Sequence, residues 1–265
     1  AYLLMTYFGQ QGRREAQKLL ERNAQDGDRL LGAFNIPMPH WLDFFCYTMF
    51  VDRDGKFQLG MLSTSAFKPL AASMGPMLKE EAFHLGTGFN GLRRIIKAGV
   101  LPLDMLQRYI NKWVSTAHDL FGVDASSSAH WAYVWGIKGR WDERKKLDSG
   151  IEVDKETLNE EARGHYHDEI VREVEKLNKY LPKDAAKLYV PHENFNRNIG
   201  VTKKQNHNTD GSKFEGSDEE WNTYITNNLP TKEDEESLKE FFKQEWIENK
   251  PMSTSQIESG IGATA

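Results

Sequence analysis

One short stretch of this 265-residue chain places two potential metal ligands at a spacing that suits a helix. Glu81 and His84 form the only Glu-x-x-His motif in the sequence. Residues three apart in an α-helix lie on one face, so the carboxylate and the imidazole can reach the same point. The same pair of residues binds metal ions in some four-helix bundles. A single motif of this kind arises readily by chance, so its value depends on the surrounding chain.

A third candidate ligand, Asp52, lies in the preceding predicted helix, residues 41–62. It follows a run of aromatic residues and a methionine, where an isolated carboxylate is costly to bury. A short turn near residues 63–66 would join two antiparallel helices. The helical rise then places Asp52 and Glu81 at similar distances from that turn, facing each other.

Two further acidic residues compete with these three. Asp54 lies about 200° further round the helix than Asp52 and adjoins Gly55 and Lys56, which favours a solvated position. Glu80 lies beside the motif, and we interpret it as a salt-bridging or supporting group. The predicted metal ligands are therefore Asp52, Glu81 and His84.

A lone helix carboxylate next to a carboxylate–imidazole pair is half of the ligand set of a di-iron site. Carboxylates are hard anionic ligands that can bridge two metal ions, and each iron normally has one imidazole. Four helices supply such a site, two with a carboxylate and two with Glu-x-x-His. This chain provides one of each, so its residues predict half of a carboxylate–histidine metal site.

The residues around these ligands resemble a known family. The likeness is carried by residues 50–59, 67–71, 78–84, 29–35, 190–197 and 199–201. Together these segments resemble the oxygenase component of the benzoyl-CoA 2,3-epoxidases, which are ferritin-like di-iron proteins, over about residues 2–242. A more distant likeness, at Asp52 and at residues 79–84, is to the catalytic subunit of the phenylacetyl-CoA epoxidases.

The resemblance implies roles for individual residues and an activity. Asp52 corresponds to the lone helix carboxylate, and Glu81 and His84 correspond to the paired iron ligands. The implied reaction is epoxidation of the aromatic ring of benzoyl-CoA by O₂. Electrons would come from NADPH through a separate reductase that carries FAD and an iron–sulfur cluster. The resemblance also implies a di-iron centre that residues outside this chain complete, because in the family the remaining ligands precede the region that corresponds to residue 1.

Two explanations account for the missing ligands. The chain can be the C-terminal part of a longer protein, inactive by itself. We favour this because residues 1–8 resemble the tail of a helix and lack a start signal. Alternatively, a homodimer can assemble the centre from two identical halves. A different class of function also fits: a metal-free ferritin-like scaffold or partner subunit, in which the three residues form a buried polar cluster. Another aryl-CoA epoxidase activity is a further alternative.

Composition restricts the remaining possibilities. The sequence is 39% hydrophobic with a formal net charge of −5, which gives no reason to expect binding to nucleic acid or to an acidic membrane. The single cysteine, Cys46, excludes an intrachain disulfide and is expected in the core. Basic clusters at residues 93–94 and 140–146 could bind CoA phosphates, but solvated surface charge is the simpler interpretation. Without a long apolar run or a signal peptide, we expect a cytoplasmic protein.

Apolar periodicity predicts an all-α fold. We expect the second half of a ferritin-like four-helix bundle in residues 1–125, further helices and loops in residues 126–247, and a disordered tail in residues 248–265. His165 and His167 are two residues apart, so they point to opposite sides of a helix and should not share a metal ion. The expected helices cover residues 13–23, 41–62, 67–98, 102–121, 127–139, 154–181, 218–228 and 232–246.

Overall fold

The computed structural model describes residues 2–21, 32–140, 157–199, 203 and 205–242. In this part of the chain the only β feature is the isolated bridge between His207 and Lys213, which confirms the predicted all-α fold. The chain divides into two compact units, Ala1–Pro230 and Thr231–Ala265. The predicted boundary near residue 125 stays a prediction. No helix among the described residues is both long and apolar enough to cross a membrane.

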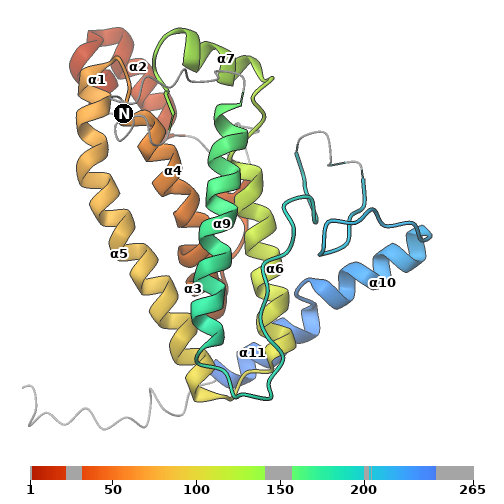
Figure 1. The fold of residues 1–265 in the computed structure, drawn as a ribbon. Helices are drawn as coiled ribbons and strands as arrows, with labels where there is room; N and C mark the ends of the chain where they lie inside the picture. The colour runs from red at the N-terminus through yellow and green to blue at the C-terminus, as the bar shows by residue number, and fades with distance from the viewer. Residues whose placement is uncertain (1, 22–31, 141–156, 200–202, 204, 243–265) are drawn as a thin grey trace, which may run out of the picture. The chain divides into compact units, whose positions relative to one another are not determined.

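The first unit contains all but one of the described helices (Figure 1). They are α1 (Tyr2–Tyr7), α2 (Gly9–Leu20), the 3₁₀ turn η2 (Gly32–Asn35), α3 (Trp41–Cys46), the π-helical turn η3 (Tyr47–Val51), α4 (Asp52–Leu62), α5 (Lys68–Ala98), α6 (Leu103–Leu120), α7 (Ser127–Val134), α9 (Leu158–Asn178) and α10 (Asp218–Asn228). The second unit contains α11 (Lys232–Phe242). The predicted helix ends near residues 23, 154 and 246, the basic residues 141–146 and the predicted tail lie outside the described residues.

Local sequence signals explain where the longest helix begins and ends. Pro69 occupies the first turn of α5, where its missing N–H costs nothing. Gly99 ends the helix with a left-handed φ of 65°, a conformation that glycine adopts without strain. The predicted helix 41–62 has the expected ends but is not uniform, because η3 separates α3 from α4.

Helices α4 and α5 are consecutive in the chain and pack along each other, and α9 packs against both (Figure 1). Their shared interior is apolar. Met49, Phe50, Phe57 and Tyr166 are fully or almost fully buried, and burial of side chains of this size supplies most of the stabilising free energy of such a core. As predicted, Cys46 is a buried free thiol.

A buried carboxylate joins α3 to α6. Asp43 is 1% exposed, and its oxygens accept hydrogen bonds from Lys112 Nζ at 2.7 Å and Trp113 Nε1 at 2.8 Å. His40, whose ring nitrogen caps α3, lies 3.1 Å from the other Asp43 oxygen and 3.0 Å from the Tyr109 hydroxyl. The carboxylate is therefore fully satisfied by partners from two helices, which fixes the start of α3 on α6.

A pair of histidines joins α6 to α9. Nε2 of His118 lies 3.3 Å from Nδ1 of His167, and the ring centroids are 5.4 Å apart, so the rings meet through one N–H···N hydrogen bond. Nδ1 of His118 is buried without a partner among the described residues. Burial lowers the pKa of His118 well below 6.5, and the nearby cationic or titratable groups lower it further: His167, Arg197, Arg163 and His192.

The Asp43 contacts predict a large loss of stability on truncation. Asp43→Ala leaves Lys112 and Trp113 without their buried acceptor and should lower the free energy of unfolding by about 3 kcal/mol. Asp104→Ala is the matched control, because Asp104 forms an exposed ion pair with Arg108 within α6. This variant should change the free energy of unfolding by less than about 1 kcal/mol. Urea denaturation measures both. Equal effects of the two variants would contradict the structural role of Asp43.

The buried histidine predicts a dependence of stability on pH. Because His118 stays neutral when folded but binds a proton when unfolded, the unfolded state gains protons as the pH falls below 6.5. Its contribution to stability is complete above that pH and is lost by up to about 1.4 kcal/mol per pH unit below it. His118→Gln should reduce the loss between pH 7 and pH 5 in urea denaturation. An identical pH slope in both proteins would contradict this.

Candidate metal centre

The structure brings the three predicted ligands together. Asp52 is the first residue of α4, and Glu81 and His84 lie one turn apart on α5. Nδ1 of His84 is 3.7 Å from Asp52 Oδ2 and 4.0 Å from Glu81 Oε2. One ligand atom from each residue lies within 4.8 Å of the others, and no other cluster of this kind occurs among the described residues.

A glycine allows the two helices to approach at this point. A Cβ atom on Gly55 would lie 3.0 Å from Glu81 Oε1 and 3.3 Å from Glu81 Cδ. Any larger residue would press on the carboxylate. Gly55 therefore has a role in helix packing, which its polar neighbours in the sequence do not suggest. The close approach places the Glu81 carboxylate between α4 and α5.

The charges of the cluster favour a cation. Burial raises the pKa of Asp52 to about 6, against the opposing effect of His84. Burial also raises the pKa of Glu81, and the charge of Asp52 raises it further. Glu81 Oε2 is buried and has no hydrogen-bond partner among the described residues. An orphaned carboxylate oxygen beside a second carboxylate and an imidazole is a donor set that fits a divalent metal ion of the iron type.

The cluster is covered on one side and open on the other. The Asp52 and Glu81 side chains are 19% and 20% exposed, whereas the His84 side chain is 49% exposed. On the outer surface of α5, which carries His84, Phe83 is 75% exposed and Met77 is 44% exposed. Glu80 is also exposed there, and it has only a minor effect, raising the pKa of Glu81.

A cavity of about 380 Å³ adjoins the two carboxylates. It is largely apolar and aromatic away from them, which is typical of sites that bind small molecules. Its walls come from η2, η3, α4, α5 and α6, with lining residues Phe34, Tyr47, Val51, Asp52, Asp54, Gly55, Gln58, Glu81 and Leu120.

The prediction that Asp54 is solvated is wrong. Asp54 is 4% exposed, lines the cavity and accepts a hydrogen bond from Gln58 Nε2 at 3.2 Å. The segment after α7 brings Lys138 Nζ to within 3.2 Å of Gln58 Oε1, so this side of α4 is covered rather than open to water. Burial, the largest influence, raises the pKa of Asp54 to about 7.

The two histidines near the middle of α9 have different surroundings, as their spacing predicts. His165 is exposed, whereas His167 pairs with His118. The residues between and after them are structural partners of α4 and η3: Tyr166 donates to the Phe50 carbonyl, and Glu169 accepts from Lys56. These two partners were not predicted from the sequence. Their spacing of three on one helix face was the available signal.

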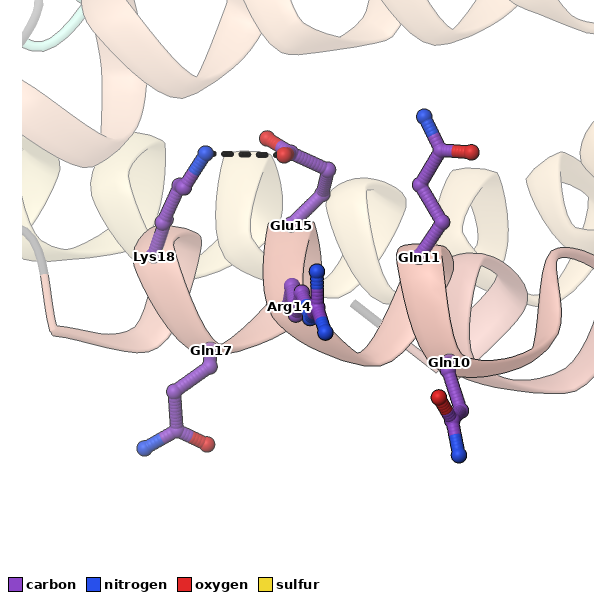
Figure 2. Close-up of a pocket in the computed structure, with 6 residues that line it drawn as sticks. All are labelled: Gln10, Gln11, Arg14, Glu15, Gln17 and Lys18. Atoms are coloured by element: carbon purple, nitrogen blue, oxygen red, sulfur yellow. Dashed lines mark hydrogen bonds and ion pairs between the residues drawn. The ribbon is translucent and has the colours of Figure 1, made fainter.

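A second hollow lies over the exposed polar surface of α2. Figure 2 shows the side chains pointing outward from one helix in different directions, with an ion pair of 2.8 Å between Lys18 and Glu15. They do not converge on a point, so we assign no site there. The lining residues are Gln10, Gln11, Arg14, Glu15, Gln17 and Lys18.

Comparison with known proteins identifies the family of the chain. The chain is 37% identical over 276 aligned residues to "Benzoyl-CoA oxygenase component B" of Aromatoleum evansii, covering 88% of this chain and 58% of the relative. It is 26% identical over 151 residues to one of the subunits of "1,2-phenylacetyl-CoA epoxidase" of Escherichia coli (strain K12), covering 56% of this chain and 43% of that protein. The chain thus spans about half the length of these curated relatives. Because residues 1–201 match the family described as phenylacetic acid catabolic protein, the chain belongs to that family.

Proposed function

We propose that Asp52, Glu81 and His84 bind iron in an oxygenase that acts on benzoyl-CoA. The observation that supports this most strongly is the convergence of the three side chains, with one buried Glu81 oxygen left without a hydrogen bond among the described residues. The substrate is proposed from the name of the Aromatoleum evansii relative. A second relative is named as an epoxidase of phenylacetyl-CoA, so another aryl-CoA is the nearest alternative substrate.

The residues of this chain would divide the work as follows. Asp52 and Glu81 offer anionic oxygens, and His84 offers Nδ1, which faces both carboxylates. The cavity wall beside them would receive the aromatic ring and exclude water, because Tyr47, Val51 and Leu120 line it. When bound, a di-iron centre supplies the activation of O₂ for epoxidation of the aromatic ring.

Three ligands are half of the set that two irons need. Two further carboxylates and a second imidazole normally come from two more helices. We propose that these helices pack on the outer face of α5, where His84 is half exposed and Phe83 is largely exposed. Residues of the same protein outside this chain are the favoured source, and a second copy of the chain is the alternative. The electron donor would be a separate NADPH-dependent reductase with FAD and an iron–sulfur cluster.

The proposed ligands predict a loss of iron on substitution. Asp52→Ala and His84→Ala should each lower the iron content of the intact protein to well under half of the wild-type value, because each removes a metal–ligand bond. His165→Ala is the matched control, since it removes an exposed histidine and should leave the iron content unchanged. The measurement is iron per chain by elemental analysis. Unchanged iron in both ligand variants would favour the metal-free scaffold instead.

Substitution of Gly55 should affect metal affinity and protein stability in opposite directions. In Gly55→Ala the new Cβ would lie 3.0 Å from Glu81 Oε1, so the carboxylate must move and the affinity for Fe²⁺ should fall about tenfold. Helix propensity alone would stabilise the variant by up to about 1 kcal/mol.

Gly164→Ala is the control for this change. Gly164 is an exposed glycine of α9 with open space around its Cβ position, so alanine there should give the gain in stability without a change in affinity. Anaerobic Fe²⁺ titration and urea denaturation measure the two quantities. Equal Fe²⁺ affinities of the two variants would show that the approach of Gly55 to Glu81 does not matter.

A further inference from the structure

The turn that precedes Asp52 is a π-helix. It covers Tyr47–Val51, between α3 and α4. A π-helical turn inserts one residue into an α-helix, and one residue corresponds to a rotation of about 100°. The turn therefore determines which side chain of α4 faces α5. With it, Asp52 faces Glu81 and His84.

Two carbonyl groups of this turn accept hydrogen bonds from side chains. The Met49 carbonyl accepts from Nε of Arg53 at 3.2 Å, and the Phe50 carbonyl accepts from the Tyr166 hydroxyl at 3.0 Å. Both donors are buried, since Tyr166 is 0% exposed and Arg53 is 5% exposed. A buried donor that found no acceptor would be costly, so each contact favours this one backbone geometry.

The same two residues connect the turn to α9. Tyr166 belongs to α9, and Arg53 forms an ion pair with Glu169, one turn further along that helix. Glu169 also accepts hydrogen bonds from Lys56 Nζ at 2.6 and 2.8 Å. Helix α9 thus contacts the backbone two residues before Asp52 and the side chains one and four residues after it.

The opposite side of the turn rests against α5. A Cβ atom on Gly88 would lie 2.5 Å from the Met49 nitrogen and 2.7 Å from Thr48 Oγ1. This contact is too close for any side chain at residue 88. The π-helical turn is therefore held by α5, through Gly88, and by α9, directly through the Tyr166 hydroxyl and indirectly through Glu169 and Arg53.

We infer that Tyr166 and Glu169 are positioning residues for the metal centre, and that they act by fixing the π-helical turn and Arg53 so that Asp52 faces Glu81 and His84. The inference rests on the proposed function, because it needs the three side chains to bind a metal ion. It assigns a task to a helix that carries none of the three proposed ligands.

The test is titration of the intact protein with Co²⁺, followed by the visible absorption of the bound ion. Co²⁺ binds oxygen and nitrogen ligand sets similar to those that bind iron. Tyr166→Phe removes the hydroxyl and keeps the ring, and Glu169→Gln removes the charge and keeps the shape. Each should raise the Kd for Co²⁺ about tenfold and change its absorption spectrum, as loss of supporting contacts does in other metal sites.

Tyr109→Phe is the matched control. Tyr109 is another fully buried tyrosine whose hydroxyl forms a hydrogen bond, in this case to His40 at 3.0 Å. It should lose as much stability in urea denaturation as Tyr166→Phe but keep the wild-type Kd and spectrum. Glu169→Gln keeps the test valid if Tyr166→Phe does not fold.

The outcomes distinguish this inference from the proposed function. Wild-type Kd and spectrum in a folded Tyr166→Phe or Glu169→Gln protein would overturn the inference. The proposed function would stand in that case if Asp52→Ala still abolished Co²⁺ binding. If wild type and Asp52→Ala bound Co²⁺ equally, or if neither bound it, the metal centre and the positioning role would both be wrong.

Discussion

The close packing of α4 against α5 is the constraint on which the candidate site depends. Asp52, Glu81 and His84 converge where these helices meet, and Gly55 leaves room for the Glu81 carboxylate between them. The same packing removes water from the acids, and the raised pKa values of Asp52 and Glu81 follow from that burial first. A protein that gathers two acids and leaves one buried oxygen without a donor among the described residues lowers its own stability there. A bound cation would remove that cost.

The ion pair beside the cluster, between Arg53 and Glu169, selects a geometry more than it adds stability. Arg53 is buried in its ion pair with Glu169, and buried ion pairs commonly add little net stability compared with apolar side chains of the same size. Their value lies in the geometry that they select. The Arg53 side chain binds one carbonyl of the π-helical turn and one carboxylate of α9, so sliding α4 along its neighbours would separate buried charges. An apolar contact would tolerate such a shift more easily.

The sequence predicted the elements whose signals are local. The helix at 218–228 begins where predicted because Ser217 and Glu220 form a capping box, and α5 ends at Gly99 because glycine suits that conformation. The π-helical turn could not be predicted, since its residues differ in no obvious way from those of an α-helix. Asp54 was misjudged because its neighbours in sequence do not include Lys138, which is 84 residues away in the sequence, acts on its pKa and donates a hydrogen bond to the adjacent Gln58. Tyr166 and Glu169 were missed for the same reason.

The three proposed ligands are not equally exposed. The Asp52 and Glu81 side chains are mostly covered and line the cavity, whereas half of His84 and most of Phe83 face outward. Oxygen chemistry on an aromatic ring requires a site from which water is excluded. A half-exposed ligand beside an exposed phenylalanine does not meet that requirement in this chain alone. The covered side can already position its ligands, so the proposed partner helices would have to supply the remaining ligands and the missing cover together, at the surface around His84.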